Sequence, residues 1–265
     1  DIQRERMQVA DDALKAPEIQ GPIQKDLVAS FKYHNTINPE AFAKDRDRLV
    51  KMGIVDAAEI NQLPEIRQEA KDRLVGSFKY HNVISPQTFA KERDSLVAVG
   101  VVDAAEVNRL PRIQQAATEN LIASFKYHNT ISPESFAKER DAFAAIGVID
   151  VAVINQLEEI RQEAKSRLIG SFRYHNTIDP KSFAKERDAF VALGVADMAE
   201  INNLEEIQKA AKEYLIASYR WHNTINPDGF TKDKNAFVAL GVVSDETVSS
   251  WLQDLNTPLA SATTP

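Results

Sequence analysis

Cysteine is absent from the 265-residue chain, which excludes disulfide bridges, thiolate metal sites and cysteine nucleophiles. Long apolar runs are absent as well, because no stretch approaches the roughly 20 residues that a membrane-spanning helix needs. Basic residues do not outnumber acidic ones, and the formal net charge of -7 has the wrong sign for a general nucleic-acid binder. These absences predict a protein without disulfides or a membrane span, and they make nucleic acid an unfavoured partner.

The missing cysteine slightly favours a secreted or bacterial protein over one of the eukaryotic cytosol. The chain begins at Asp1, with no initiator methionine and no signal-like apolar stretch. We therefore expect a processed, trimmed or excised segment. The localisation itself stays open at this level.

Motifs of catalysis are missing too. The chain contains no glycine-rich phosphate loop, no nucleophile elbow and no HExxH zinc motif. Many of its acids lie at helical pairing distance from bases, as Glu69 does from Arg73, which is typical of a solvated helix face. The sequence therefore predicts a non-enzymatic protein with no catalytic residue, no cofactor and no metal.

The sequence does contain a tandem repeat. The hexapeptide Ser-Phe-Lys-Tyr-His-Asn returns with small changes, and its copies contain all five histidines. The five copies begin at Ser30, Ser77, Ser124, Ser171 and Ser218, a constant step of 47 residues. A fixed period of this length indicates a row of like units, each unable to bury its apolar face alone.

Each unit is predicted to begin with a long helix. In the second unit Pro64 suits a first helical position, and the buried face recurs at steps of four: Ile66, Ala70, Leu74 and Phe78. His81 falls in the last turn, where a donor side chain meets the free carbonyls. Asn82 follows, and asparagine tolerates the left-handed conformation found just past helix ends.

A medium and a short helix follow in each unit. The medium helix starts at a capping residue plus proline, the pairs being Asn38-Pro39, Ser85-Pro86, Ser132-Pro133, Asp179-Pro180 and Asn226-Pro227. It ends at a glycine in every unit: Gly53, Gly100, Gly147, Gly194 and Gly241. Asp103 and its equivalents cap the short helix. Where the next unit lacks proline, as at Leu157-Glu158, we expect the short helix to bend into the long one without a full break.

These elements divide the chain into an N-terminal cap (residues 1–25), a five-repeat array (26–255) and a loose tail (256–265). Gly21 and Pro22 should break or kink the entry to the array, and the closing helix should cover Ser244 to Leu255. The predicted fold is an all-α, right-handed α-solenoid with divergent end caps. Its helix rhythm resembles the architecture of armadillo and HEAT repeats. That resemblance implies a fold only and carries over no functional residues.

The basic, aromatic and histidine residues of the motif form the candidate binding site. They are Lys32, Tyr33, His34, Lys79, Tyr80, His81, Lys126, Tyr127, His128, Arg173, Tyr174, His175, Arg220, Trp221 and His222. One hypothesis is an exposed row that offers a cation, a ring and an imidazole once per unit. The other is structural, with histidine finishing the helix and the aromatic ring filling the groove between units. The ring lies about 200° around the helix from the motif phenylalanine, which allows either placement.

An arginine of the medium helix also recurs, at Arg46, Arg93, Arg140 and Arg187, and its spacing directs it toward the apolar stripe. A buried arginine requires a partner, and the candidates are Glu59, Glu106 and Glu200 on the short helices, with Val153 as the exception. We expect an ion-pair series that locks unit to unit, since Lys234 replaces the arginine in the last unit. The alternative is an arginine row facing a carboxylate or phosphate partner.

The preferred hypothesis for function is a repeat scaffold that binds a protein or peptide, with one equivalent site per repeat and a gain from effective concentration. One alternative is a structural spacer or self-assembly element of a larger surface or secreted protein, with the aromatic rings buried between units. Another is a helical repeat that binds nucleic acid one base per unit, which near-identical units disfavour. A shared metal site is disfavoured because equivalent histidines of stacked units should lie about 10 Å apart. The oligomeric state is not indicated.

Overall fold

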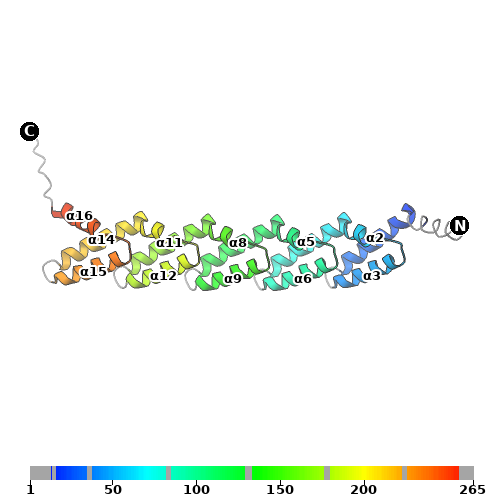
Figure 1. Ribbon diagram of the computed structural model, residues 1–265, viewed down its shortest axis with the longest axis horizontal. Coiled ribbons are helices and arrows are strands. Elements are labelled where there is room, and N and C mark those ends of the chain that lie inside the picture. Colours follow the sequence, from blue (N-terminus) through cyan, green and yellow to red (C-terminus); the bar gives the residue numbers. More distant parts are fainter. Residues whose placement is uncertain are drawn as a thin grey trace, which may run out of the picture. The chain divides into compact units, whose positions relative to one another are not determined.

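The structure is a computed structural model, and it describes residues 13, 16–34, 38–81, 85–128, 133–175, 180–222 and 226–256. These residues form helices and their connecting turns, with no strand anywhere in the described ranges. The prediction of an all-α protein is therefore confirmed for this part of the chain. Figure 1 follows the helices in chain order.

The helices fall into three length classes that alternate along the chain. The long helices, each of 18 residues, are α2 (Pro17–His34), α5 (Pro64–His81), α8 (Pro111–His128), α11 (Glu158–His175) and α14 (Glu205–His222). The medium helices, each of 13 residues, are α3 (Pro39–Lys51), α6 (Pro86–Ala98), α9 (Pro133–Ala145), α12 (Pro180–Ala192) and α15 (Pro227–Ala239). The short helices, each of 5 residues, are α4 (Ala57–Asn61), α7 (Ala104–Asn108), α10 (Val151–Asn155) and α13 (Met198–Asn202), and α16 (Asp245–Asn256) comes last.

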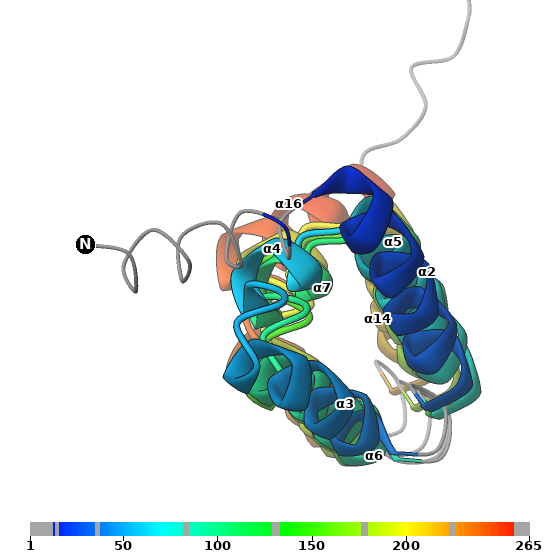
Figure 2. The ribbon, with the colours of Figure 1, turned by 90° about the vertical axis from the view of Figure 1, so that its right-hand side faces the viewer.

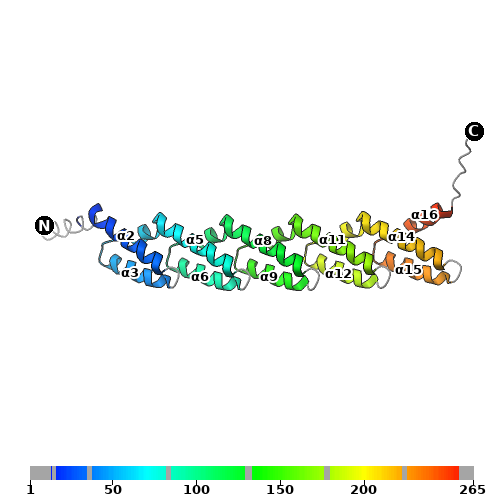
Figure 3. The ribbon, with the colours of Figure 1, turned by 180° about the vertical axis from the view of Figure 1, so that it is seen from behind.

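The chain divides into two compact units, the first comprising residues 1–121 and 139–150 and the second residues 122–138 and 151–265. In the first unit α2 packs on α3 and α5 packs on α6, while α2 lies beside α5 and α3 beside α6. Figure 2 shows α2 and α5 in one row, α3 and α6 in another, and α4 and α7 in a third. In the second unit α11 packs on α12, α14 packs on α15, and α11 lies beside α14 (Figure 3).

Phenylalanine rings join the long helices to the medium ones. Phe78 on α5 meets Phe89 on α6 edge to face with ring centroids 4.9 Å apart, and it also meets Phe143 at 5.8 Å. In the second unit Phe172 and Phe183 make the same 4.9 Å contact. All five side chains are fully or almost fully buried, and each such pair adds roughly 0.5–1.5 kcal/mol beyond the burial of its area. The phenylalanine of the repeated motif is therefore a core residue that fixes the end of the long helix.

The medium helices begin at the predicted residues, but the cap hydrogen bond is made unevenly. The Asn38 side chain accepts a hydrogen bond from a backbone N–H of the first turn of α3 at 3.1 Å. Ser85 precedes α6 and Asn226 precedes α15 without a side-chain cap bond. The predicted caps Ser132 and Asp179 lie outside the described residues. Proline at the first position, with its fixed φ, is the start signal shared by the medium helices.

The predicted ends of the medium helices and starts of the short ones are confirmed. Gly53, Gly100, Gly147, Gly194 and Gly241 all have positive φ, between 69° and 83°, the conformation that glycine adopts without strain. Asp56, Asp103 and Asp197 accept backbone hydrogen bonds from the first turns of α4, α7 and α13. Each aspartate thereby satisfies N–H groups that the helix itself leaves free.

The entry to the array was predicted to break or kink at Gly21 and Pro22, and the break is wrong. α2 is one helix with Pro22 inside it, so residue 25, the predicted end of the cap, falls within this helix. Pro22 is the sixth residue of α2, and it removes one hydrogen bond, to the carbonyl four residues back. The hydrogen bonds on either side are enough to continue the helix.

The bend predicted at Leu157-Glu158 is also wrong, because α10 and α11 are separate helices. The Leu157 N–H donates to the carbonyl of Ile154, and the Leu157 carbonyl accepts from the N–H of Ile160, both at 3.1 Å. These tight turns end one helix and open the next without proline. The gap of two residues equals the one that precedes the proline-started long helices.

The closing helix α16 begins one residue after the predicted start, and the Ser244 hydroxyl accepts a hydrogen bond from the N–H of Thr247 at 3.1 Å. Residues 257–265 of the predicted tail and residues 1–12 of the predicted cap lie outside the described residues, as do Asn82 and its equivalents. Within the described ranges, none of the helices combines the length and apolar character needed to cross a lipid bilayer.

Candidate binding site on the long helices

The basic and aromatic residues of the motif lie on the outside of the long helices, in their last turn. The side chains of Tyr33 and Tyr80 are 69% exposed, those of Tyr127 and Tyr174 66%, and that of Trp221 71%. The preceding cations are exposed as well: Lys32, Lys79, Lys126, Arg173 and Arg220. Of the two placements that the spacing allows, the rings have the exposed one. We call these ten side chains the exposed row.

The histidines of the motif are half-buried and hold the exposed rings in place. Tyr80 contacts His81 edge to face with ring centroids 4.9 Å apart. His81 Nε2 lies 3.5 Å from Oε1 of Glu92 on α6, and Arg73 lies 3.9 Å from the same carboxylate. The same arrangement recurs in the second compact unit (residues 122–138 and 151–265), with Tyr174, His175, Glu186 and Arg167. The histidine therefore links the ring to the medium helix.

In the part of the chain that the structure describes, the cations of the exposed row have no acidic partner, unlike cations that lie earlier on the same helix. Lys32, Lys79, Lys126, Arg173 and Arg220 have no acidic side chain within 4 Å among the described residues. By contrast, Arg67 and Lys71, about three and two turns earlier on α5, both pair with Glu106, and the Lys71 Nζ lies 2.6 Å from its carboxylate. The row thus presents positive charge that folding leaves uncompensated at close range.

Glu106 and Glu200 are the acids with the clearest electrostatic role in the fold. A hydrogen bond from Lys71 is the main cause that lowers the pKa of Glu106, helped by the charge of Arg67. Lys165 and Arg161 lower the pKa of Glu200 in the same way. These carboxylates join a long helix to the following short one. In the described part of the chain, no three histidine, aspartate or glutamate side chains gather closely enough to hold a metal ion.

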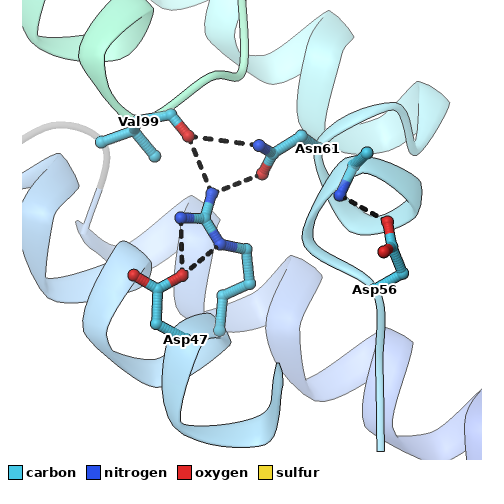
Figure 4. Close-up of polar contacts among 6 residues, drawn as sticks. Asp47, Asp56, Asn61 and Val99 are labelled. Carbon is cyan, nitrogen blue, oxygen red and sulfur yellow. Dashed lines mark hydrogen bonds and ion pairs between the residues drawn. The ribbon is translucent and has the colours of Figure 1, made fainter. Parts of the chain in front are cut away.

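The recurring arginine of the medium helix is buried and has a partner that the sequence analysis missed. Arg46 Nη1 donates to Oδ1 of Asn61 at 2.7 Å and to the carbonyl of Val99 at 2.8 Å. The amide of Asn61 donates to the same carbonyl at 3.2 Å. On the other side of the guanidinium, Arg46 Nη2 forms an ion pair with Oδ1 of Asp47 at 2.7 Å. Figure 4 shows Asp47, Asn61 and Val99 grouped around the guanidinium.

This group of contacts joins one repeat to the next and recurs. Arg93 donates to Asn108 at 2.8 Å and to the carbonyl of Ile146 at 2.7 Å. Arg187, in the second unit, donates to Asn202 and to the carbonyl of Leu240, both at 2.8 Å. The expectation of a locking role agrees with these contacts. The expected partners Glu59, Glu106 and Glu200 are wrong, because the neutral asparagine two residues further along the short helix lies closer to the guanidinium.

The last repeat changes both members of the pair at once. Lys234 stands where the arginine would be, and Ser249 stands 15 residues later where the asparagine would be. Lys234 pairs instead with Asp245 at 2.6 Å. An arginine and an asparagine that keep a spacing of 15 residues and are lost together are the signal that could have identified this pair from the sequence.

Alternate repeats share residues that their immediate neighbours lack, and this pattern is missed when each repeat is compared only with the next one. We call the second and fourth repeats (64–110 and 158–204) the even repeats and the others the odd repeats. The even repeats have an arginine, Arg67 or Arg161, at the position where the odd repeats have Gln20, Gln114 and Gln208. Gln114 and Gln208 each donate to main-chain carbonyls, whereas the arginines pair with acids. The even repeats also have Gly76 and Gly170 where the odd ones have alanine. At these two positions the sequence therefore recurs every two repeats.

Comparisons with protein-family models, with curated proteins and with solved structures found no match to this chain. Among the described residues, the exposed row combines large apolar area, unpaired charge and strict repetition.

Proposed function

We propose that the protein is a non-enzymatic helical-repeat scaffold whose exposed row binds a protein or peptide, with one site per repeat. The observation that carries this proposal is the exposure of the five aromatic side chains, between 66% and 71%. Burying an aromatic ring releases free energy, so folding alone gives no reason to keep one ring outside at the same position of every repeat. Tyrosine, tryptophan and arginine contribute most of the binding energy at many protein interfaces.

The same exposure weighs against the spacer hypothesis, which expects the rings to be buried between units. The arginine–asparagine contacts weigh against an arginine row that faces a partner, because Arg46, Arg93 and Arg187 are only 5–7% exposed. Several equal sites on one chain would raise the apparent affinity for a partner that carries several copies of its binding segment.

We also propose that the five repeats form a right-handed α-solenoid with divergent ends, as the 47-residue recurrence of the helix bounds supports. Small-angle X-ray scattering of the chain in solution tests this architecture. An elongated particle with a maximum dimension well above that of a globular protein of the same mass is expected. A compact particle would exclude the solenoid.

The binding proposal is tested by affinity capture from the native source, with bound proteins identified by mass spectrometry. The test variant carries serine at Tyr33, Tyr80, Tyr127, Tyr174 and Trp221. The control variant carries serine at Met52 and Val153, which are also exposed (56% and 60%) but lie outside the row. We expect the parent and the control to retain a partner that the test variant loses.

Equal recovery of the partner by all three proteins would contradict the proposal. The ultraviolet absorbance ratio of the captured material is recorded as well, because copurifying nucleic acid that depends on the row would support the nucleic-acid alternative instead.

A further inference from the structure

Gly76 and Gly170 occupy exposed positions inside the long helices α5 and α11. Glycine in a helix interior costs about 0.5–1 kcal/mol relative to alanine. Neither glycine has positive φ, and a Cβ added at either position would meet nothing within 4 Å. Backbone conformation and internal packing therefore give no reason for these glycines, although the odd repeats use alanine at the same position.

The two glycines lie on the same helix face as the exposed row. Lys79 and Tyr80 follow Gly76 by three and four residues, the spacing at which side chains of a helix are neighbours. Arg173 and Tyr174 follow Gly170 in the same way. A glycine beside an exposed ring lets another chain approach the helix backbone closely. The even repeats thus allow a closer approach than the odd repeats do.

Charge separates the even sites from the odd ones as well. Lys32, in the first repeat, borders a groove of about 500 Å³ that is also lined by Glu65, Glu69 and Asp72 of α5. Lys126, in the third repeat, is followed at the equivalent positions by Glu159 and Glu163. Acids of the next long helix therefore share the groove with Lys32 and recur at the equivalent positions after Lys126, where they oppose a negatively charged partner.

The even sites have less negative charge than these two odd sites. After Lys79, Arg112 and Ala116 stand at the positions of Glu65 and Glu69, while Glu119 keeps the acid at the position of Asp72. After Arg173, Glu206 and Glu213 keep two of the three acids, Ala210 replaces the third, and Lys209 adds a base at the position of Gln68. An unpaired cation with few acids around it attracts a carboxylate most strongly.

The exposed ring of each even site contacts the histidine that follows it, as the rings of Tyr33 and Tyr127 do in the odd repeats. Tyr80 and Tyr174 contact histidines that reach the carboxylates of Glu92 and Glu186 at 3.5 Å and 3.6 Å. A side chain that is already ordered loses less conformational entropy when a partner binds. At each even site the aromatic ring, the cation and the glycine backbone thus lie on one helix face.

On this basis we propose that the scaffold has two principal docking sites, Gly76–Lys79–Tyr80 and Gly170–Arg173–Tyr174, and that each takes an acidic segment of a partner protein. The segment lies against the helix backbone at the glycine, places a carboxylate at the cation and an apolar side chain on the ring. This inference rests on the proposed binding function and replaces five equal sites with two strong and three weak ones.

The test uses a phage-displayed library of random dodecapeptides, selected on the immobilised full chain. Enriched peptides are then synthesised with a fluorescent label and titrated with the parent and two variants. The Gly76→Ala/Gly170→Ala variant adds a methyl group at each principal site. The Ala123→Gly/Ala217→Gly variant is the matched control in the odd repeats.

We expect peptides rich in aspartate and glutamate, with two bound per chain in calorimetric titration. The Gly76→Ala/Gly170→Ala variant should bind them about tenfold more weakly, because a methyl group inserted into a close contact opposes it, while its melting temperature rises. The control variant should melt earlier and bind as the parent does. Binding and stability change in opposite directions, so a folding defect cannot imitate the result.

Three outcomes would overturn the inference: a selection that yields no acidic binder, unchanged binding by the Gly76→Ala/Gly170→Ala variant, or five equal sites per chain. The serine variant of the exposed row separates the two proposals. If it loses the peptides while the glycine changes have no effect, the binding function stands and the two-site inference falls. If it binds the peptides as the parent does, both fall.

Discussion

Arg46 on α3 and Asn61 on α4 share one acceptor, the carbonyl of Val99, and are joined to each other by a 2.7 Å hydrogen bond. The carbonyl belongs to the next repeat, 53 residues after the arginine. A main-chain acceptor tolerates any side chain at its own position, so the same junction can recur with Val99, Ile146 or Leu240. The contact thus fixes how successive repeats join while leaving the sequence of the acceptor residue free.

Replacing Asn61 by alanine should lower the free energy of unfolding by about 1.5–3 kcal/mol, because a buried guanidinium loses a hydrogen-bond partner. Urea denaturation followed by circular dichroism measures the effect. The control is Ser249→Ala, at the equivalent position of the last repeat, where a change within about 0.5 kcal/mol is expected. Equal effects of the two substitutions would remove the junction from the account of stability.

Gly147→Val should be more harmful than Gly53→Val. Both glycines have positive φ, 74° and 69°, so valine is strained at either position by about 1–2 kcal/mol. A Cβ at Gly147 would lie 3.0 Å from the side-chain Nδ2 of Asn108, whereas one at Gly53 would meet nothing within 4 Å. The difference between the two melting temperatures isolates the steric part, and no difference would show that the junction can yield.

The acids of the even repeats should make stability depend on pH. Glu106 and Glu200 have folded-state pKa values below the ordinary 4.5, caused first by hydrogen bonds from Lys71 and Lys165. Their contribution is therefore fully present above pH 4.5 and is lost as the pH falls through the lowered values. The double variant Glu106→Gln/Glu200→Gln should melt earlier than the parent at pH 7, with the difference shrinking toward pH 3.

The control for the pH experiment is Glu59→Gln, in the first repeat. Glu59 makes no ion pair in the described part of the chain, and Gln20 and Gln24 replace the cations of the even repeats. Its melting temperature should follow that of the parent at both pH values. A constant effect of the double variant from pH 7 to pH 3 would mean that the two carboxylates act through packing rather than charge.

His81→Ala should cost about 0.3–1 kcal/mol, because the histidine is half-buried and its pair with Glu92 is long, at 3.5 Å. Chemical denaturation measures this loss. If the inference about the even repeats holds, the variant should also bind acidic peptides more weakly than its stability predicts, since the ring of Tyr80 is freed. A loss of several kcal/mol would instead identify His81 as part of the buried core.

The candidate site was only partly predictable from sequence. The cation, ring and histidine were identified from their repetition, but repetition alone could not tell an exposed ring from a packed one. The exposed fraction of Tyr80 depends on how α5 lies against its neighbours, and this is a property of packing. The partner of Arg46 was missed for a similar reason. From sequence alone, an acid such as Glu59 is the expected partner of a buried arginine, and a neutral asparagine is not.

The sequence by itself determined the helices of this protein, because start prolines, capping aspartates, terminal glycines and apolar steps of four act over a few residues. Tertiary structure decided which side chains meet across repeats, since Arg46 reaches a carbonyl 53 residues away only after α3, α4 and α6 have packed. It also decided that Tyr80 is exposed, whereas the apolar steps of four already placed Phe78, two residues earlier, on the buried face. The apolar steps of four indicate which face of α5 is covered, but they do not show whether a ring on another face, such as that of Tyr80, is covered by a neighbouring helix.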